Sequence, residues 1–579
     1  MKEITGSQII VESLKKEGVD IVFGYPGGQA IPIFDALYSA KEIQIVLTRH
    51  EQAAVHAAEG YAKSTGKVGV VLVTSGPGAT NTVTGLADAT FDSVPIVCLC
   101  GQVPTVMIGN DAFQEADITG ITNAVTKHNY LVHNIADLAE AIKNSFYIAK
   151  TGRPGAVLID VPKDVSISKL EFKYDSEINI RGYKPHTEAN INQIKKAAEL
   201  IERSKKPVII SGGGAMISEA SMEIRALAEK CNIPVTVTLT GFGSIAYDAS
   251  YFLGMHGMHG TIAANKAIQE SDLLIALGSR FDDRATGKLS TFAPNAKIIH
   301  IDIDPASISK NVTVEVPVVA NLKTALEKLL PILPKIERKE WSARISELKN
   351  MTHEIPRDLK KLTSIEVMEA LNKIMPDDTI IATDVGQHQM WTAMYYKFKY
   401  PRTFLTSGGL GTMGVGFPYA IGAQLANPEK RVLCISGDGS IQMNIQELAT
   451  AVIEELPVIV VIMNNGYLGM VRQWQELFFD KRYSSTCLMK CKHRNLECDG
   501  NVDKCLKYLP DFVKVAEAYG AIGIRVKTKD ELDKALLKAL ESKDTPVFID
   551  AITEREENVW PMVPAGASLD EIMKGGFPA

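Results

Sequence analysis

The chain has 579 residues, of which 46% are hydrophobic and 22% are charged, a composition that suits about three or four globular domains and excludes a disordered chain. The formal net charge of −6 and the lack of a basic block argue against a nucleic-acid partner. No apolar run approaches the roughly 20 residues that span a bilayer, and the N-terminus shows no signal-peptide pattern. The 8 cysteines do not suggest a secreted disulfide framework. We therefore expect a cytoplasmic protein with no membrane partner.

The first part of the chain alternates apolar strands with helices of amphipathic spacing. Strands are predicted at 21–23, 43–47, 68–74 and 95–100, and helices at 6–16, 31–39, 49–63 and 75–88. This alternation is typical of a parallel sheet covered by helices on both faces. The sequence therefore predicts one α/β domain over residues 1–170.

Glu51 stands near the start of the third predicted helix. A carboxylate in this position is commonly only a favourable partner for the helix dipole. A carboxyl group whose pKa is raised by burial can instead share a proton with a bound base. Both readings of Glu51 are open on the residue alone.

A second series of strands follows a linker and is predicted to form a domain over residues 187–335. The strands are expected at 208–210, 234–239, 273–277 and 298–304. Gly212 and Gly213 follow the first of them, and Asp302 lies at the end of the last. Glycines and an acidic residue at strand ends are typical of dinucleotide-binding domains, although a glycine run is also an ordinary turn.

After a polar stretch, a third domain is predicted over residues 363–555. Two apolar runs, 432–435 and 458–463, end at Gly437-Asp438-Gly439-Ser440 and at Asn464-Asn465, with a helix expected over 441–455 between them. Carboxyl ends of adjacent parallel strands meet at one edge of a sheet, so Asp438 and Asn465 should meet there.

These residue types point to a bound metal and diphosphate. The oxygens of Asp438, Asn465 and the Tyr467 carbonyl are hard ligands that suit Mg²⁺. The glycines would let main-chain N–H groups approach an anion, and the helix expected next would add its positive end. Either piece alone would be an ordinary turn, but both together at two strand ends favour a metal-diphosphate site.

The Gly-Asp-Gly and Asn-Asn pair resembles the cofactor motif of thiamin diphosphate enzymes. Five segments resemble the catalytic subunit of the biosynthetic, FAD-containing acetohydroxyacid synthase, also called acetolactate synthase. They are residues 49–52, 101–104, 111–117, 153–155 and 160–164. The resemblance continues to about residue 565. It implies three doubly wound parallel-sheet α/β domains, which bind the aminopyrimidine (1–170), FAD (187–335) and the magnesium-diphosphate (363–555), followed by a C-terminal lid (556–579).

The resemblance implies that the protein decarboxylates pyruvate on thiamin diphosphate. The hydroxyethyl unit would then join pyruvate or 2-ketobutyrate, giving 2-acetolactate or 2-aceto-2-hydroxybutyrate, in the first common step of valine, leucine and isoleucine biosynthesis. Mg²⁺ and FAD are further implied cofactors. A homodimer or homotetramer is implied, because Glu51 and the metal site lie in different domains and this family builds its site between subunits. A small regulatory subunit is an expected partner.

Individual roles follow from the same resemblance. Glu51 would activate the aminopyrimidine and Met413 would hold the cofactor bent. The 2-keto acids would meet Phe113, Gln114, Lys163, Arg284 and Trp474. Metal ligands would be Asp438, Asn465 and Tyr467. Thiamin diphosphate would contact Val385, Gly386, Gln387, His388, Gly411, Met413, Gly437, Gly439, Ser440 and Met470. FAD would contact Arg153, Gly212, Gly213, Met255, His256, Arg280, Asp282 and Asp302.

Four other readings stay open as alternatives. A pyruvate oxidase or a 2-keto acid decarboxylase would share the cofactor site, but Lys163 and Trp474 favour the carboligase. Glyoxylate carboligase lacks the activating glutamate, so Glu51 argues against it. A catalytically silent paralogue is the remaining reading, and the competent residues at each named position oppose it.

The sequence departs from the family at two places. Asn321 stands where the family usually has an aspartate near FAD, and its effect on FAD binding is open. Residues 487–507 are an insertion that contains Cys487, Cys491, His493, Cys498 and Cys505. Zinc binding, a redox-labile pair and a plain variant loop are all compatible with these spacings, which are wider than those of standard zinc sites.

Overall fold

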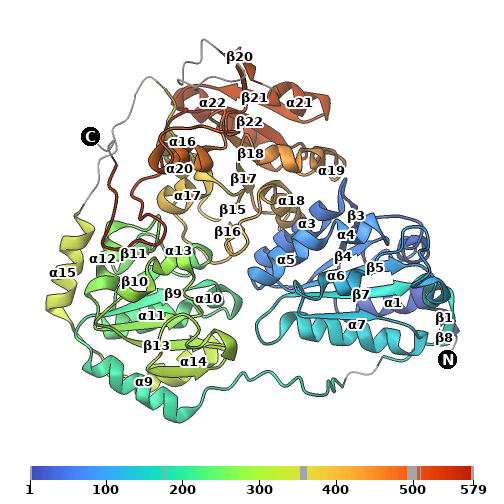
Figure 1. The fold of residues 1–579 in the computed structure, drawn as a ribbon, viewed down its shortest axis with the longest axis horizontal. Helices are drawn as coiled ribbons and strands as arrows, with labels where there is room; N and C mark the ends of the chain where they lie inside the picture. Colours follow the sequence, from blue (N-terminus) through green and yellow to red (C-terminus); the bar gives the residue numbers. More distant parts are fainter. Residues whose placement is uncertain (1–2, 175–176, 352–360, 492–504, 509, 576–579) are drawn as a thin grey trace.

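The computed structural model describes residues 3–174, 177–351, 361–491, 505–508 and 510–575. There the chain forms three α/β units: a first unit (3–174), a central unit (177–351) and a third unit (361–555). Each contains one six-stranded sheet in which all neighbouring strands are parallel. Figure 1 shows the first unit in blue, the central unit in green and the third in yellow to red. The predicted fold class is confirmed.

The first unit has the strand order β3-β2-β4-β5-β7-β6. Its strands are β2 (Ile21–Tyr25), β3 (Gln44–Leu47), β4 (Gly69–Val73), β5 (Ile96–Gln102), β6 (His128–Leu131) and β7 (Ala156–Pro162). Successive strand side chains point to opposite faces, so one face packs on α1 (Gly6–Lys16), α2 (Ile31–Tyr38) and α7 (Ile135–Lys150). The other face packs on α3 (Glu51–Thr65) and α5 (Val83–Phe91).

Smaller elements complete the first unit. They are α4 (Pro77–Thr80), α6 (Ile118–Thr122), α8 (Lys163–Ile167) and the antiparallel pair β1 (Glu3–Thr5) and β8 (Lys169–Glu171). The single helix predicted over 75–88 is wrong, because α4 and α5 are separate helices. The first of them ends at Thr80, with Asn81 as its C-cap residue, and the Asn81 side chain donates to Glu51 at 2.9 Å.

The central unit has the order β11-β10-β9-β12-β13-β14. The strands are β9 (Pro207–Ser211), β10 (Val235–Val237), β11 (Phe252–Met255), β12 (Leu273–Leu277), β13 (Lys297–Asp302) and β14 (Val316–Val319). This is the doubly wound order of dinucleotide-binding folds. One face packs on α9 (Ile191–Arg203), α11 (Ser221–Cys231) and α14 (Leu322–Leu329), and the other on α12 (Ile262–Glu270) and α15 (Lys339–Lys349).

The third unit has the order β16-β15-β17-β18-β22-β21, which repeats the topology of the first. Its strands are β15 (Ile380–Thr383), β16 (Phe404–Leu405), β17 (Val432–Gly437), β18 (Ile459–Asn464), β21 (Ile522–Val526) and β22 (Val547–Ile552). One face packs on α16 (Ser364–Ile374), α17 (Gln387–Tyr395) and α22 (Lys529–Glu541). The other packs on α18 (Gly416–Ala426), α19 (Leu448–Ile453) and α21 (Phe512–Ala518).

The helix predicted over 441–455 is largely wrong. Two 3-10 turns, Ile441–Met443 and Ile445–Glu447, precede the short helix α19. Asn444 interrupts the run with φ −136°, and its side chain donates to the Gly414 carbonyl at 2.8 Å. No α-helix N-terminus therefore follows Ser440 directly, so the expected helix dipole does not contribute there.

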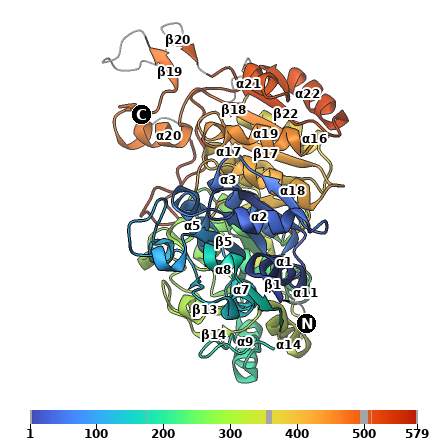
Figure 2. The same ribbon diagram turned by 90° about the vertical axis from the view of Figure 1, so that its right-hand side faces the viewer.

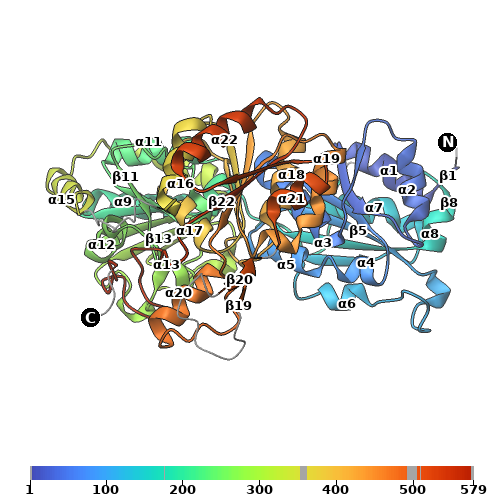
Figure 3. The same cartoon turned by 90° about the horizontal axis from the view of Figure 1, so that it is seen from above.

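The first and third units pack together through α3 and α18, which cross at two glycines. A Cβ on Gly60 would lie 2.1 Å from the Tyr419 carbonyl oxygen, and one on Gly422 would lie 1.8 Å from that of Ala57. Larger side chains would push the helices apart. Figure 1 shows the third unit above the central and first units, and Figure 3 shows it from above, lying across the middle of the molecule.

The tail after the third sheet crosses to the central unit. The Val563 N–H donates to the Met258 carbonyl at 2.7 Å and the Lys288 N–H donates to Ala567 at 2.9 Å, while Leu569 joins the central core. The tail thus ties two units together, and whether it acts as a lid stays a prediction.

The cysteine insertion contains a hairpin that projects from the third unit, at the upper left of Figure 2. Strands β19 (Met489–Cys491) and β20 (Cys505–Tyr508) are antiparallel, with Cys491 opposite Cys505 in the backbone register. His493 and Cys498 lie outside the described residues. In the described part of the chain no helix is both long and apolar enough to cross a membrane.

Candidate active site

The predicted metal ligands lie at the carboxyl edge of the third sheet. Strands β17 and β18 are parallel neighbours, with Gly437 opposite Met463. Asp438 and Asn465, which follow these strand ends, therefore line one pocket together with Tyr467. The Asp438 carboxylate accepts the Gly466 N–H at 2.8 Å, and the Asn465 side-chain oxygen accepts the Tyr467 N–H at 2.9 Å. These bonds fix the direction of both oxygen-bearing side chains.

The same pocket collects most of the predicted thiamin diphosphate contacts. Its lining includes Val385, Gly386, Gln387, His388, Met413, Gly437, Gly439, Ser440 and Met470. Gly411 is outside this lining, in the loop before Met413, and a Cβ on it would lie 3.9 Å from Val385. The pocket lining comes from the ends of three neighbouring strands, from α17 and α20 (Gly469–Phe478), and from the loop that carries Met413.

The chemistry of this pocket fits a magnesium-bound diphosphate. His388 is buried, and its Nε2 has no hydrogen-bond partner within the described residues. Burial lowers the pKa of His388 to about 3, so the imidazole is neutral and can donate or accept through that nitrogen. A Cβ on Gly437 would lie 2.9 Å from His388 Nδ1, which leaves room for glycine alone.

A loop of the third unit that carries Met413 is fastened to the first unit. The Ser407 hydroxyl donates to Asp88 at 2.5 Å and accepts the N–H groups of Gly411 and Thr412 at 3.0 Å each. The Thr412 hydroxyl also donates to Asp88, at 3.0 Å. Asp88 therefore positions the loop that brings Met413 to the pocket, and sequence reasoning missed it.

The predicted reaction residues of the first unit lie apart from this pocket. The Glu51 carboxylate accepts the Asn81 side-chain N–H at 2.9 Å, and the Lys163 ammonium donates to the Gly28 carbonyl at 3.2 Å. Gln114 has a left-handed φ of 61°, and the preceding Phe113 is 85% exposed. The lining of the third-unit pocket includes none of Glu51, Phe113, Gln114 and Lys163. One chain therefore does not bring them to its own metal pocket.

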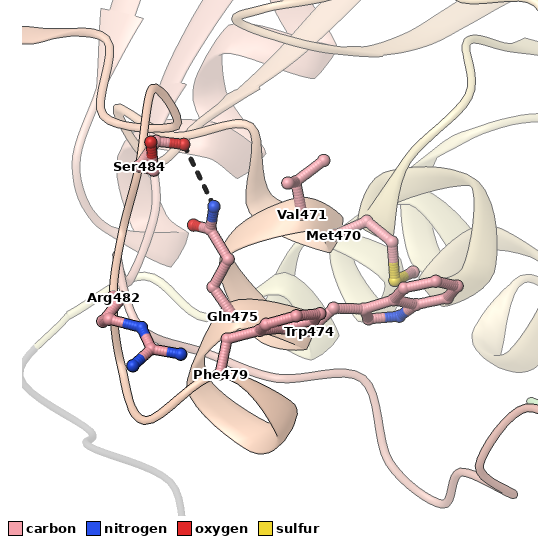
Figure 4. A pocket seen from close by; sticks show the side chains of 7 residues that line it. All are labelled: Met470, Val471, Trp474, Gln475, Phe479, Arg482 and Ser484. Carbon is pink, nitrogen blue, oxygen red and sulfur yellow. Dashed lines mark hydrogen bonds between the residues drawn. The ribbon is translucent and has the colours of Figure 1, made fainter.

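Arg284 and Trp474 do come together, although the central and third units supply them separately. The guanidinium carbon lies 5.5 Å from the centre of the indole ring, within cation–π range. The indole nitrogen is buried and has no partner among the described residues. Figure 4 shows Trp474 on α20 with Met470 and Val471, which also line the metal pocket. The pocket that Trp474 lines together with Gln475, Phe479, Arg482 and Ser484, called the Trp474 pocket, therefore adjoins the metal pocket.

The predicted FAD contacts gather at the carboxyl edge of the central sheet. Met255 ends β11 and Asp302 ends β13. The other contacts follow strand ends: Gly212 and Gly213 follow β9, His256 follows β11, and Arg280 and Asp282 follow β12. A Cβ on Gly212 would lie 2.1 Å from the Gly278 carbonyl oxygen, so this turn requires glycine. Such an edge is where doubly wound sheets bind nucleotides.

Charged groups surround that edge. The Arg153 guanidinium of the first unit lies 3.7 Å from the Asp304 carboxylate. Asp282 accepts the Ala285 N–H at 3.0 Å and so caps the short helix α13 (Asp283–Thr286). Burial lowers the pKa of His256 to about 4, which keeps it neutral.

Asn321 has a structural task of its own. Its side-chain oxygen accepts the Thr324 N–H at 3.3 Å and caps α14. Asparagine and aspartate cap helices about equally well, so this task does not depend on which of the two residues is present.

The cysteine insertion begins beside the metal pocket. The Leu468 N–H donates to the Thr486 carbonyl and the Leu488 N–H donates to that of Gly466, both at 2.9 Å. The Arg555 guanidinium, missed by sequence reasoning, lies 4.5 Å from the Tyr467 ring centre and donates to the Asn465 carbonyl at 3.2 Å. Motif spacing did not reveal either contact.

Comparison with known families agrees with this architecture. Family models of thiamine pyrophosphate (thiamin diphosphate) enzymes match the chain in three parts: the N-terminal TPP binding domain at residues 4–121, the central domain at 194–329 and the C-terminal TPP binding domain at 384–551. Fold, pocket and models together define a thiamin diphosphate-dependent enzyme.

Individual relatives narrow the class. The chain is 48% identical to the acetolactate synthase large subunit of Corynebacterium glutamicum, over 99% of this chain and 90% of that protein. It is 45% identical to the large subunit from Haemophilus influenzae, over 99% and 98% of the two chains. Identity to the acetolactate synthase isozyme 3 large subunit of Escherichia coli is 44%, over 99% of each. The chain belongs to the acetolactate synthase large-subunit family.

Proposed function

We propose that this chain joins two 2-keto acids, forming 2-acetolactate from two pyruvates and 2-aceto-2-hydroxybutyrate from pyruvate and 2-ketobutyrate. The observation that carries the proposal is the Arg284–Trp474 pair beside the metal pocket. The guanidinium can pair with the carboxylate of an acceptor keto acid, and the indole face offers an apolar surface for its alkyl group. A decarboxylase or an oxidase has no second keto acid to hold.

The pocket of the third unit would hold thiamin diphosphate with Mg²⁺. Asp438, Asn465 and the Tyr467 carbonyl would bind the ion, and His388 and Gln387 would face the diphosphate. When bound, the cofactor supplies the nucleophilic carbon and the electron sink for decarboxylation. Met413 would support the cofactor from the side, on a loop that Asp88 and Ser407 hold in place.

Glu51 would hold and return a proton at the aminopyrimidine ring. Its carboxylate is half-buried and is oriented by Asn81. Phe113, Gln114 and Lys163 would meet the keto acids from the same unit. Because these residues do not line the pocket of their own chain, we infer that a second copy supplies them, in a homodimer or a homotetramer. The relatives are large subunits, which supports a small regulatory subunit as a further partner.

The central unit would hold FAD at the edge that Gly212, Asp302 and His256 share. The doubly wound strand order and the glycine-only turn support a dinucleotide there. The net reaction transfers no electrons, so FAD would be structural. Arg153 reaches this edge from the first unit and would link FAD binding to the packing of two units.

Product analysis tests the proposal. Purified protein receives pyruvate, thiamin diphosphate, Mg²⁺ and FAD, with and without 2-ketobutyrate, beside a Glu51→Gln control. We expect acetolactate, which gives way to acetohydroxybutyrate when 2-ketobutyrate is present, and a loss of at least about 100-fold in the control. Acetaldehyde, or peroxide with acetyl phosphate, would instead make the protein a decarboxylase or an oxidase.

A further inference from the structure

Glu447 is a fully buried carboxylate that the reaction scheme does not use. It ends the second 3-10 turn after the metal loop and precedes α19 in the third unit. Its two oxygens accept the main-chain N–H of Arg49, in the first unit, at 2.9 and 3.1 Å. The Thr450 hydroxyl donates to the same carboxylate at 2.6 Å and so orients it. The Glu447 side chain of the third unit thus accepts a hydrogen bond from the main chain of the first unit, two residues before Glu51.

Burying an ionisable group at this place is costly, which argues against an incidental contact. Burial raises the pKa of Glu447 to about 7. The Arg49 guanidinium donates to the Leu47 carbonyl at 2.8 Å and to that of Thr48 at 3.4 Å. The direct bonds to Glu447 therefore come from main-chain and hydroxyl donors, and a carboxylate accepts such bonds more strongly than a neutral oxygen does.

The segment that Glu447 holds determines where the Glu51 side chain points. His50 is extended, with φ −152° and ψ 142°, and its ring nitrogen accepts the Gln52 N–H at 3.2 Å, so that α3 begins at Glu51. The far end of Glu51 meets Asn81 at 2.9 Å. Hydrogen bonds thus hold both the main chain before Glu51 and the carboxylate at the end of its side chain. The bond from the Arg49 N–H is the one that the third unit accepts, through Glu447.

The same turn also contacts the loop that carries Met413 to the metal pocket of its own chain. Three residues before Glu447, the Asn444 side chain donates to the Gly414 carbonyl at 2.8 Å, beside Met413. A single short segment, 441–447, therefore contacts the residue after Met413 and the segment before Glu51. Both contacts hold main-chain groups in place, and neither involves a residue that lines the metal pocket.

We propose that Glu447 is a positioning residue for Glu51, which holds the Arg49–Glu51 main chain so that the Glu51 carboxyl group meets the aminopyrimidine ring. The inference rests on the proposed role of Glu51. Because that role places Glu51 in a site completed by a second copy, Glu447 of one chain serves a site whose metal pocket lies in the other.

The test compares Glu447→Gln with the matched control Glu454→Gln. Glu454 stands at the other end of α19 and also spans the two units, accepting from the Gln44 side chain at 2.8 Å. For Glu447→Gln we expect kcat to fall by roughly 10- to 100-fold, as a misplaced reacting group does. The KM for pyruvate and the affinity for thiamin diphosphate with Mg²⁺ should stay within about twofold, as should all values for the control.

Two further readouts separate positioning from general damage. The exchange of the cofactor C2 proton and the circular dichroism band of its imino tautomer should both weaken in Glu447→Gln and persist in Glu454→Gln. In a Glu51→Gln background, Glu447→Gln should cause no further loss of C2 exchange, because residues that act as a unit are not additive. If Glu447→Gln does not fold, Thr450→Val, which removes the orienting hydroxyl, should give the same pattern at smaller size.

The outcomes distinguish this inference from the proposed function. Three results would each overturn the positioning role. The first is an equal, additive loss of C2 exchange when Glu447→Gln is placed in the wild type and in Glu51→Gln. The others are a weakened cofactor affinity with unchanged C2 exchange, and an unchanged kcat in a folded Glu447→Gln variant. Wild-type protein that makes no acetolactate, or a Glu51→Gln variant that keeps its activity, would overturn the proposed function itself.

Discussion

Single residues of the candidate site are held by main-chain donors before any cofactor arrives. Asp438 accepts from Gly466, and Asn465 accepts from Tyr467. Mg²⁺ demands near-ideal octahedral geometry, so ligands that are already oriented need little rearrangement. Glu51 is oriented as well, by the side-chain amide of Asn81 instead of a main-chain donor.

Replacing Trp474 should change the choice of acceptor. Trp474→Leu removes the ring face that Arg284 covers at 5.5 Å, a contact worth about 0.5–2 kcal/mol. With equal pyruvate and 2-ketobutyrate, we expect the ratio of acetohydroxybutyrate to acetolactate to fall about tenfold. Phe479→Leu, in the same pocket, should leave the product ratio within about twofold. An unchanged ratio in Trp474→Leu would remove Trp474 from acceptor binding.

His56 should make stability depend on pH. It is fully buried, 2.9 Å from Glu59 and close to Asp88 and Lys63, and burial lowers its pKa from 6.5 to about 4. Below pH 6.5 the unfolded chain binds a proton here that the folded chain does not. The contribution of the neutral imidazole is therefore complete above pH 6.5 and is lost as the pH falls toward 4.

Thermal denaturation at several pH values measures this effect. Between pH 6.5 and 4.5 the wild type should lose more stability than His56→Gln, by about 1.4 kcal/mol per pH unit. His133 is exposed, so the control variant His133→Gln should lose stability with falling pH at the same rate as the wild type. Parallel melting curves for the wild type and His56→Gln would show that His56 does not titrate in this way.

Residues next to a motif were predictable from sequence, and residues that hold a motif from a distance were not. Asp438 and Asn465 could be paired because strand ends meet at a sheet edge. Asp88 and Glu447 contact segments more than 300 positions away in the sequence. A lone carboxylate in a helical stretch looks like a solvated charge, so nothing local marks either residue.

Among the elements, the loop over residues 407–414 is held in part by the Ser407 hydroxyl. Ser407 donates one hydrogen bond and accepts two, and each is worth about 1 kcal/mol. Ser407→Ala should therefore raise the thiamin diphosphate concentration needed for half-maximal activity roughly tenfold. Cofactor titration of the apoenzyme measures this.

Thr403→Val is the matched control for that titration. The Thr403 hydroxyl is buried just before β16 and donates to the Tyr400 carbonyl at 2.7 Å, whereas the loop begins after that strand. It should leave the cofactor dependence within about twofold. If both variants weaken cofactor binding equally, the loop has no special dependence on Ser407.

Strands were easier to predict than the turns that connect them. The apolar runs at 432–435 and 458–463 mark β17 and β18, because a strand buried on both faces is apolar throughout. The 3-10 turns at 441–447 replace a helix because Asn444 bonds to Gly414, 30 positions earlier in the chain. That contact exists only in the folded unit, so helical composition alone was misleading.

The whole molecule repeats one topology at its two ends, and a unit with the strand order of dinucleotide-binding folds lies between them in sequence. The first and third units share their strand order, and α3 and α18 cross through glycines. Three units could be predicted from the alternation of strands and helices. The proposal that a second copy completes the site came from the resemblance alone, because the strand and helix pattern does not reveal which side chains one chain leaves exposed, such as Phe113 at 85%.

The most direct test of the account mixes two inactive variants, Glu51→Gln and Asp438→Asn, and measures acetolactate formation after subunit exchange. If the site combines Glu51 of one chain with the Asp438 pocket of another, half of the random dimers contain one intact site. The mixture should then recover about a quarter of the wild-type activity. A mixture that stays as inactive as each variant alone, although exchange is complete, would contradict a site shared between two copies of this chain.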